Sequence, residues 1–205
     1  MKRLTWDAPV VPFQSLAGIK LSTPADVFER SLERYRLGGS DRFQFEHGPV
    51  LRLEKLDSYV FYVEESFGDY ESLDVLLFVA VEQGVISCVE ARLPGVCEEE
   101  GVNPVAEAVC YKGKWFDCRL GEGVQKIVDH CELYYDSADE SHVPDSSVGG
   151  VSVMTNFLAN VDRCPDQYVT RISVFKEAIN EDWLEGAKEE KKRVRESREW
   201  TWPGE

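Results

Sequence analysis

The segment from Leu73 to Val81 is a nearly continuous apolar run, and it constrains the fold more than any other part of the chain. A short run rich in valine and leucine predicts a central strand that is covered on both faces of a sheet. Gln83 and Gly84 follow the run and favour a tight turn, after which Val85 to Leu93 has the composition of a partner strand. The chain is therefore expected to contain a sheet built around this hairpin.

Other segments with strand-like composition extend the sheet. Four of them are rich in β-branched or aromatic residues or follow a glycine break, at 50–53, 59–64, 148–154 and 168–175. Residues 108–111 and 115–120 flank Lys112-Gly113, which predicts one more hairpin with a tight turn. A polar loop is expected from Asp136 to Ser147. Strands that follow one another through short turns favour antiparallel pairing.

Helical spacing appears twice. Apolar or small residues recur along one face at Val27, Phe28, Ser31, Leu32 and Tyr35. The preceding Ser22-Thr23-Pro24 is typical of a capped helix start, and Gly38-Gly39 is typical of a helix end. A second set with the same spacing consists of Val124, Ile127, Val128 and Cys131. The sequence thus predicts an α+β protein with an antiparallel sheet and two or three helices.

The two helices and their surroundings match each other at an offset of 99 residues. Ile19-Lys20-Leu21 then corresponds to Cys118-Arg119-Leu120, and Phe28 corresponds to Ile127. This pattern predicts two structurally similar halves, at 1–95 and 104–176, each a helix packed on antiparallel strands. The alternative is one continuous mixed sheet with helices on one face.

The remaining residues, 177–205, differ in composition from both halves. Glu177 to Arg198 favours a helix and contains possible i,i+4 ion pairs such as Glu189 with Arg193. Trp183 and Leu184 are expected to dock the start of this charged helix, and the part beyond Ala187 is expected to project into solvent or to fray. Trp200 and Trp202 are candidates for an anchor or a contact surface.

The charge of the chain limits its partners. Among 205 residues there are 23 lysines and arginines against 38 aspartates and glutamates, a formal net charge of -15. A charge this negative argues against nucleic acid and anionic lipid as direct partners, because both would repel it. No stretch approaches 18 uninterrupted apolar residues, and no apolar run follows Lys2-Arg3 at the start. A cytoplasmic location is therefore expected.

Catalytic signatures are scarce, so no catalytic residue, metal or cofactor is predicted. The chain has no nucleophile elbow, no P-loop and no zinc-binding H-E-x-x-H, and Gly121-Glu122-Gly123 lacks the third glycine of a dinucleotide-binding loop. No two cysteines have C-x-x-C spacing, which favours reduced, buried thiols. His130 and Cys131 are adjacent on a predicted helix and do not face each other. The acidic loop around His142 lacks calcium-loop spacing.

Two acidic clusters are the strongest remaining indication of function. Carboxylates interleaved with aromatic rings suit recognition of a basic protein surface, because the rings supply contact area and the carboxylates supply steering. One cluster is Glu98, Glu99 and Glu100, in the connector between the halves. The other consists of Tyr134, Tyr135, Asp136, Asp139, Glu140 and Asp145. These nine residues are the predicted partner-binding residues.

The chain resembles the immunity proteins of bacterial toxin systems. The resemblance lies in the glycine-led strand Gly149-Gly150-Val151-Ser152-Val153, the closing strand Arg171-Ile172-Ser173-Val174-Phe175, and the opening Gly18-Ile19-Lys20-Leu21 before a capped helix. It implies a non-catalytic protein that binds one cognate toxin in the cytoplasm and covers its active site. Three alternatives stay open: an enzyme or small-ligand-binding protein with an unrecognised pocket, an adaptor that self-associates through its tail, and a DNA mimic.

Overall fold

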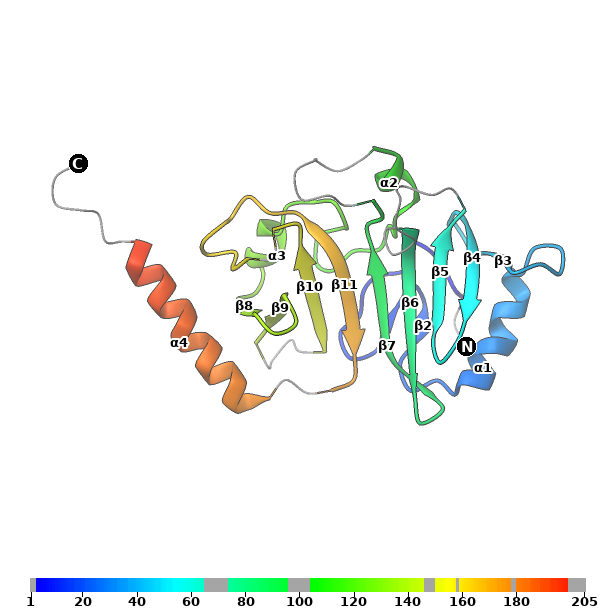
Figure 1. Ribbon diagram of the computed structural model, residues 1–205, viewed down its shortest axis with the longest axis horizontal. Coiled ribbons are helices and arrows are strands. Elements are labelled where there is room, and N and C mark those ends of the chain that lie inside the picture. The colour runs from blue at the N-terminus through cyan, green and yellow to red at the C-terminus, as the bar shows by residue number, and fades with distance from the viewer. Residues whose placement is uncertain are drawn as a thin grey trace.

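The computed structural model describes residues 3–64, 74–95, 104–145, 150–157, 159–177 and 180–198. Within these ranges the chain is α+β, as predicted, and its largest element is one nine-stranded antiparallel sheet. The sheet runs across the molecule between α1 and α4 (Figure 1). Its strand order is β3-β4-β5-β6-β7-β11-β10-β9-β8. The sheet is larger than the sequence suggested.

The first part of the chain supplies five strands of this sheet and a separate two-stranded pair. Its strands are β1 (Ser15–Leu16), β2 (Ile19–Lys20), β3 (Arg42–Gln44), β4 (Val50–Lys55), β5 (Tyr59–Val63), β6 (Val75–Glu82) and β7 (Val85–Arg92). Strands β4 to β7 confirm the predicted segments, whereas the short β1, β2 and β3 were not predicted. Gln83 and Gly84 have φ angles of 51° and 77°, the left-handed pair that a two-residue hairpin turn requires.

The first helix, α1 (Ala25–Leu32), confirms the apolar spacing, because Phe28 and Leu32 are both buried. It continues into the 3-10 helix η1 (Glu33–Tyr35). The predicted capping hydroxyl is wrong, since Pro24 occupies the N-cap and no side chain caps the helix. Ser22 instead has a φ of 61°, and its backbone N–H donates to Ile86 O at 2.8 Å. The residues before the helix are therefore fixed by pairing with β7.

The second part supplies four strands and three helices. They are α2 (Pro104–Val109), α3 (Gln125–Val128), β8 (Leu133–Asp136), β9 (Ser141–Pro144), β10 (Val151–Thr155), β11 (Val169–Phe175) and α4 (Glu181–Arg198). The strands β10 and β11 and the helix α3 were predicted. The predicted polar loop from 136 to 147 is wrong over its first half, because β8 and β9 form a hairpin there.

The predicted hairpin around Lys112-Gly113 is wrong. Residues 104–109 form α2, and residues 111–124 contain only turns and isolated bridges. The reason is a competing partner, the N-terminal segment. The indole Nε1 of Trp6 donates to Val109 O at 3.0 Å and to Cys110 O at 2.9 Å, and Lys112 N donates to Trp6 O at 2.9 Å.

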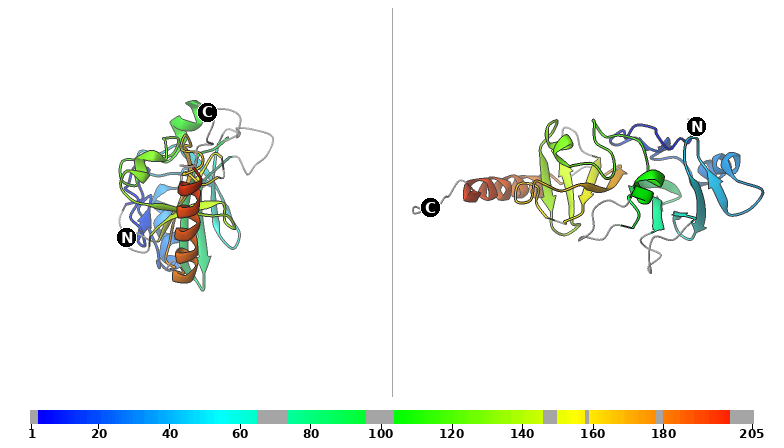
Figure 2. Two further views of the ribbon diagram at one scale, coloured as in Figure 1. Left: turned by 90° about the vertical axis from the view of Figure 1, so that its left-hand side faces the viewer. Right: turned by 90° about the horizontal axis from the view of Figure 1, so that it is seen from above.

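One face of the sheet carries the core. Register aligns Phe61, Leu77, Ala91, Ile172 and Val153 in a row across five strands, and each is at most 1% exposed. The N-terminal segment and α3 lie on the same side of the sheet (Figure 2). The prediction that the central strand is covered on both faces is wrong, because Phe78 of β6 is only half-buried. Among the described residues, the hairpin connections β4–β5, β6–β7 and β8–β9 supply no crossover helix that could lie over the second face.

Corresponding backbone hydrogen bonds occur in both parts: the residues before each helix are related by the predicted offset of 99, and their strand partners by an offset of 83. Ile86 N donates to Thr23 O at 2.9 Å, and Val169 N donates to Glu122 O at 2.9 Å. The bonds on either side of these also correspond: Ser22 N to Ile86 O matches Gly121 N to Val169 O, and Ala25 N to Gly84 O matches Val124 N to Gln167 O. In each part, therefore, the residues before the helix pair with the start of the last strand in the same way.

The C-terminal helix α4 docks along its length and does not project into solvent. Leu184, Lys191 and Val194 are each at most 4% exposed. The Lys191 ammonium donates to Leu133 O at 2.6 Å and lies 3.2 Å from the Asp162 carboxylate. This helix covers the edge strand β8, whose outer backbone would otherwise be open to pairing with another chain. Trp200 and Trp202 lie outside the described residues. Among those described, no helix combines the length and apolarity needed to cross a membrane.

Candidate protein-binding face

The face of the sheet opposite the core bears an unusual set of charged side chains. We name it the open face, and its central residues are Arg42, Arg52, Glu54, Val60, Tyr62, Phe78, Glu90, Arg92, Ser152, Met154, Arg171 and Ser173. They alternate along their strands with the buried residues of the core face. The open face therefore combines arginines, aromatic rings and a methionine on one surface.

Glu90 is the centre of the open face. Its side chain is 10% exposed, although it lies on the side of the sheet away from the core. One carboxylate oxygen accepts from Arg92 Nε at 2.5 Å. The other accepts from Ser173 Oγ at 2.9 Å and from Arg171 Nη1 at 3.4 Å. A carboxylate with this little exposure is stable only because three donors surround it.

The two arginines are directly opposite each other on β7 and β11. Like charges in this position destabilise a sheet, and Glu90 offsets their repulsion. Burial lowers the pKa of the Arg171 guanidinium, while the neighbouring Glu90 carboxylate opposes that shift. The side chains of Arg92 and Arg171 are 30% and 33% exposed. Both guanidinium groups are thus held in place and remain within reach of a partner.

The cluster lies at the centre of symmetry of the strand pairing. Ile86 and Val169 make the equivalent hydrogen bonds described above, which relates β7 to β11 by an offset of 83 residues. Glu90 then corresponds to Ser173, and these two residues are direct partners in the register. On either side of them Arg92 pairs with Arg171 and Cys88 pairs with Phe175, and the same offset of 83 converts one of these pairs into the other. The joint between the two parts of the chain therefore coincides with the ion-pair cluster.

A second arginine pair lies nearer the β3 edge. Arg42 and Arg52 are direct partners on β3 and β4. Arg42 Nη2 lies 2.5 Å from the Glu64 carboxylate, and the Arg52 guanidinium lies 4.6 Å from the centre of the Tyr62 ring. Between the two arginine pairs, Val60 and Phe78 are direct partners and both are half-buried. Arginine, aromatic residues and methionine are enriched where proteins contact one another.

The structure separates the predicted partner-binding residues. Tyr134 is 5% exposed, because it packs beneath α4 with Val143 and Leu184. Its hydroxyl donates to Glu132 at 2.8 Å, so this ring serves the docking of α4. Four residues, Tyr135, Asp136, Asp139 and Glu140, line the β8–β9 hairpin, and Asp145 directly follows β9. Glu98, Glu99 and Glu100 lie outside the described residues.

Among the residues that the structure describes, the histidines and cysteines do not gather in one place. His142 is fully buried on the core face, where burial lowers its pKa to about 4, and its Nε2 donates to Ala159 O at 3.1 Å. His130 stacks on Phe116 at 4.8 Å between ring centres. Burial raises the pKa of the Cys88 thiol to about 12, with Glu90 adding to the shift. Within the described ranges, no group of three histidine, cysteine or carboxylate side chains has the arrangement of a metal site.

Sequence reasoning missed the open face as a functional candidate. Its residues come from seven strands, and only the strand order places Arg92 beside Arg171. One signal was available: several predicted strands carry an arginine or glutamate between apolar neighbours, as in Glu90 between Val89 and Ala91. Comparison of the chain with protein-family models, with curated proteins and with solved structures finds no match.

Proposed function

We propose that this chain is a non-catalytic protein that binds a partner protein, a bacterial toxin, and neutralises it by contact. The open face is the observation that carries the proposal. It presents two held arginine pairs with Phe78, Tyr62 and Met154 around them. An interface of this composition gains its affinity from a few buried anchors, and prior ordering of Arg92 and Arg171 reduces the entropy lost on binding.

The acidic charge of the chain acts at long range, whereas the open face itself carries four arginines against two glutamates. A net charge of -15 attracts a basic partner over a distance of about one Debye length, roughly 8–10 Å at physiological salt. The hairpin residues Asp136, Asp139 and Glu140 are the part of the predicted acidic site that stays at the surface. We assign them to steering and the open face to anchoring, since rim charges mainly change the association rate.

The repeated hydrogen bonds support the predicted pair of similar halves. In this interpretation, each half contributes its last strand to the centre of the sheet, and the two halves join through β7 and β11. Such a joint extends one sheet across both halves and creates an open face wider than either half has alone. The domain boundaries at 1–95, 104–176 and 177–205 remain a prediction.

Affinity purification from the native host tests the proposal. The tagged full-length chain is expected to retain one stoichiometric protein through a high-salt wash. That protein, expressed alone, is expected to stop bacterial growth, and co-expression with this chain is expected to restore growth. Retention of a partner whose activity is unaffected by this chain would contradict neutralisation.

Two variants separate the proposed roles. Ser152→Arg places bulk and charge on the open face, and Glu189→Arg makes the same kind of change on an α4 position whose side chain is 75% exposed. Only the first is expected to abolish growth rescue. Charge reversal of Asp136, Asp139 and Glu140 together is expected to slow association and to leave neutralisation at saturating protein intact.

A further inference from the structure

A cavity with a basic lining lies beside the N-terminal segment, away from the open face. Its volume is about 620 Å³, and it is lined by Asp7, Pro9, His47, Lys112, Lys114 and Arg119. Three cations and one carboxylate line it, whereas carboxylates outnumber cations 38 to 23 in the whole chain. The sign of the local charge is therefore opposite to that of the protein, which favours an anionic ligand.

Three chain segments form the walls, and backbone hydrogen bonds tie them together. Trp6 N donates to Glu46 O at 2.8 Å, Lys112 N donates to Trp6 O at 2.9 Å, and Val10 N donates to Lys114 O at 2.9 Å. These bonds connect the N-terminal segment to the residue before His47 and to the segment that carries Lys112 and Lys114. The backbone that carries Asp7, His47, Lys112 and Lys114 is thus held in position before a ligand arrives.

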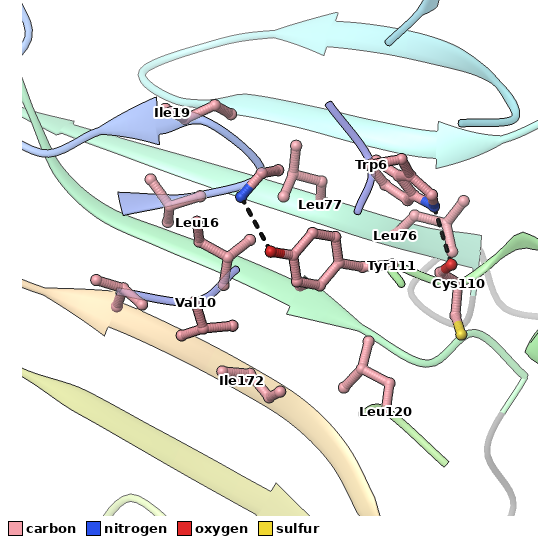
Figure 3. Close-up of a cluster of buried hydrophobic side chains, with 14 of the residues drawn as sticks. Trp6, Val10, Leu16, Ile19, Leu76, Leu77, Cys110, Tyr111, Leu120 and Ile172 are labelled. Carbon is pink, nitrogen blue, oxygen red and sulfur yellow. Dashed lines mark hydrogen bonds between the residues drawn. The ribbon is translucent and has the colours of Figure 1, made fainter. Parts of the chain in front are cut away.

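The buried rings of Trp6 and Tyr111 support these segments from within the core (Figure 3). The Trp6 indole donates to Cys110 O at 2.9 Å, and the Tyr111 hydroxyl accepts from Ala17 N at 3.3 Å and donates to Ala8 O. Trp6 is 1% exposed and Tyr111 is fully buried. Both rings therefore fix the backbone beside Asp7, Pro9 and Lys112 and leave the cavity lining to polar side chains.

The backbone at the rim of the cavity is strained at His47 and tightly packed at Gly113. His47 has a φ of 61°, a left-handed conformation in which a non-glycine residue is strained. Gly113 is packed so tightly that an added Cβ would overlap Ala8 O and the Tyr111 hydroxyl. Strain of this kind concentrates at binding sites, where the surrounding structure enforces it.

The cations are partly engaged and still have donors to offer. Lys112 Nζ donates to Glu107 O and Lys114 Nζ lies 4.0 Å from the Asp117 carboxylate. An ammonium has three donor hydrogens and the Arg119 guanidinium has five. The hydroxyl of Thr5 donates to Asp7 at 2.5 Å and holds the pKa of that carboxyl below its usual value. With Asp7 charged, the lining retains a net charge of two positive units.

From these contacts we infer that the cavity binds a small molecule whose phosphate groups carry several negative charges. A guanidinium matches two phosphate oxygens through paired hydrogen bonds, and two ammonium groups neutralise the remaining charge. The described lining has no phenylalanine, tyrosine or tryptophan side chain, and His47 supplies one imidazole ring, so we assign recognition to the phosphate part. A free small molecule is the expected source, because the negative charge of the whole chain repels nucleic acid and anionic membranes.

Calorimetric titration of the full-length chain with inorganic pyrophosphate at low ionic strength tests the inference. Saturable binding with a stoichiometry of one is expected, and Lys114→Gln with Arg119→Gln is expected to weaken it at least about a hundredfold, roughly tenfold for each lost charge-assisted contact. Lys192→Gln with Arg193→Gln removes the same two charges from exposed α4 positions and is expected to change the affinity less than about twofold.

Each other outcome overturns the inference. Absence of saturable pyrophosphate binding would show that the cavity does not bind phosphate groups. Equal weakening in both double variants would show that the binding depends on overall charge. Citrate binding as tightly as pyrophosphate contradicts the assignment to phosphate. Amide chemical-shift changes on pyrophosphate addition to the unmodified chain are expected at His47 and at residues 112–119, and changes centred elsewhere refute this location even if a variant misfolds.

Discussion

Replacing Glu90 by glutamine tests the physical account of the open face. The change keeps the size of the side chain and its ability to accept from Ser173 Oγ, but it removes the charge that lies between Arg92 and Arg171. The two guanidinium groups then face each other across β7 and β11 without a counter-ion. We therefore expect Glu90→Gln to destabilise the fold through charge alone.

The magnitude follows from distance and exposure. Unit charges about 4 Å apart interact with about 1 kcal/mol in water and about 4 kcal/mol at an effective dielectric constant near 20. Each arginine side chain is about one-third exposed and Glu90 is 10% exposed, which places both pairs between these limits. We expect a loss of about 2–3 kcal/mol in the free energy of unfolding, below the roughly 3–5 kcal/mol for a fully buried pair.

Urea unfolding measured by tryptophan fluorescence at low ionic strength gives the free energy directly. Glu54→Gln on the same face is the matched control, and we expect it to stay within about 0.5 kcal/mol of the unmodified protein. Adding Arg92→Gln to Glu90→Gln is expected to recover part of the loss, because it removes the Arg92–Arg171 repulsion. Equal stability of the Glu90 and Glu54 variants would refute the reasoning.

Three further predictions concern stability. Lys191→Met is expected to cost about 2–3 kcal/mol, because it leaves Leu133 O without its donor and leaves the Asp162 carboxylate with Arg195 Nε at 3.0 Å. Lys192→Met, at a position 78% exposed, is expected to cost less than about 0.5 kcal/mol in the same urea assay. The folded-state pKa of His142, about 4, lies below the unfolded value of about 6.5, so the unfolded chain binds more protons between these pH values. The contribution of His142 to the free energy of unfolding is then fully present above pH 6.5 and falls by up to about 3 kcal/mol as the pH drops to 4. His142→Gln is expected to remove this part of the pH dependence. A constant difference in stability between the two proteins from pH 7 to 4 would contradict this prediction. Gly186→Ala in α4, where a Cβ would meet no atom within 4 Å, is expected to stabilise the fold by about 0.5–1 kcal/mol and to raise its melting temperature, and a lowered melting temperature would show that this turn of α4 is not helical.

The spacing of apolar residues along the sequence predicted most of the helices and strands, because buried side chains recur with the period of the helix or strand that contains them. The apolar run at 75–81 and the spacing of Phe28 and Leu32 are examples. The failures have a different origin. Residues 108–120 have strand-like composition, but hydrogen bonds from Trp6, more than a hundred positions away, hold them elsewhere. Lys191 looked like part of a solvent-exposed helix until β8 provided its carbonyl partner.

The candidate sites depended even more on long-range order. Acidic residues were conspicuous in the sequence because they are consecutive or nearly so, as at Asp139-Glu140. Glu90 and Ser173 are 83 positions apart, and only the register of β7 on β11 brings them into contact. The same holds for the basic cavity, whose lining joins Asp7 and His47 to Arg119. Such sites have no signature in local spacing.

Affinity of the purified partner for the Ser152→Arg variant is the most direct test of the central claim, that the open face anchors the partner. Measured by calorimetry beside Glu189→Arg, the Ser152 variant is expected to bind at least about a hundredfold more weakly, and the Glu189 variant is expected to bind within about threefold of the unmodified chain. Unchanged affinity of the folded Ser152 variant would contradict the claim and would place the contact elsewhere on the molecule.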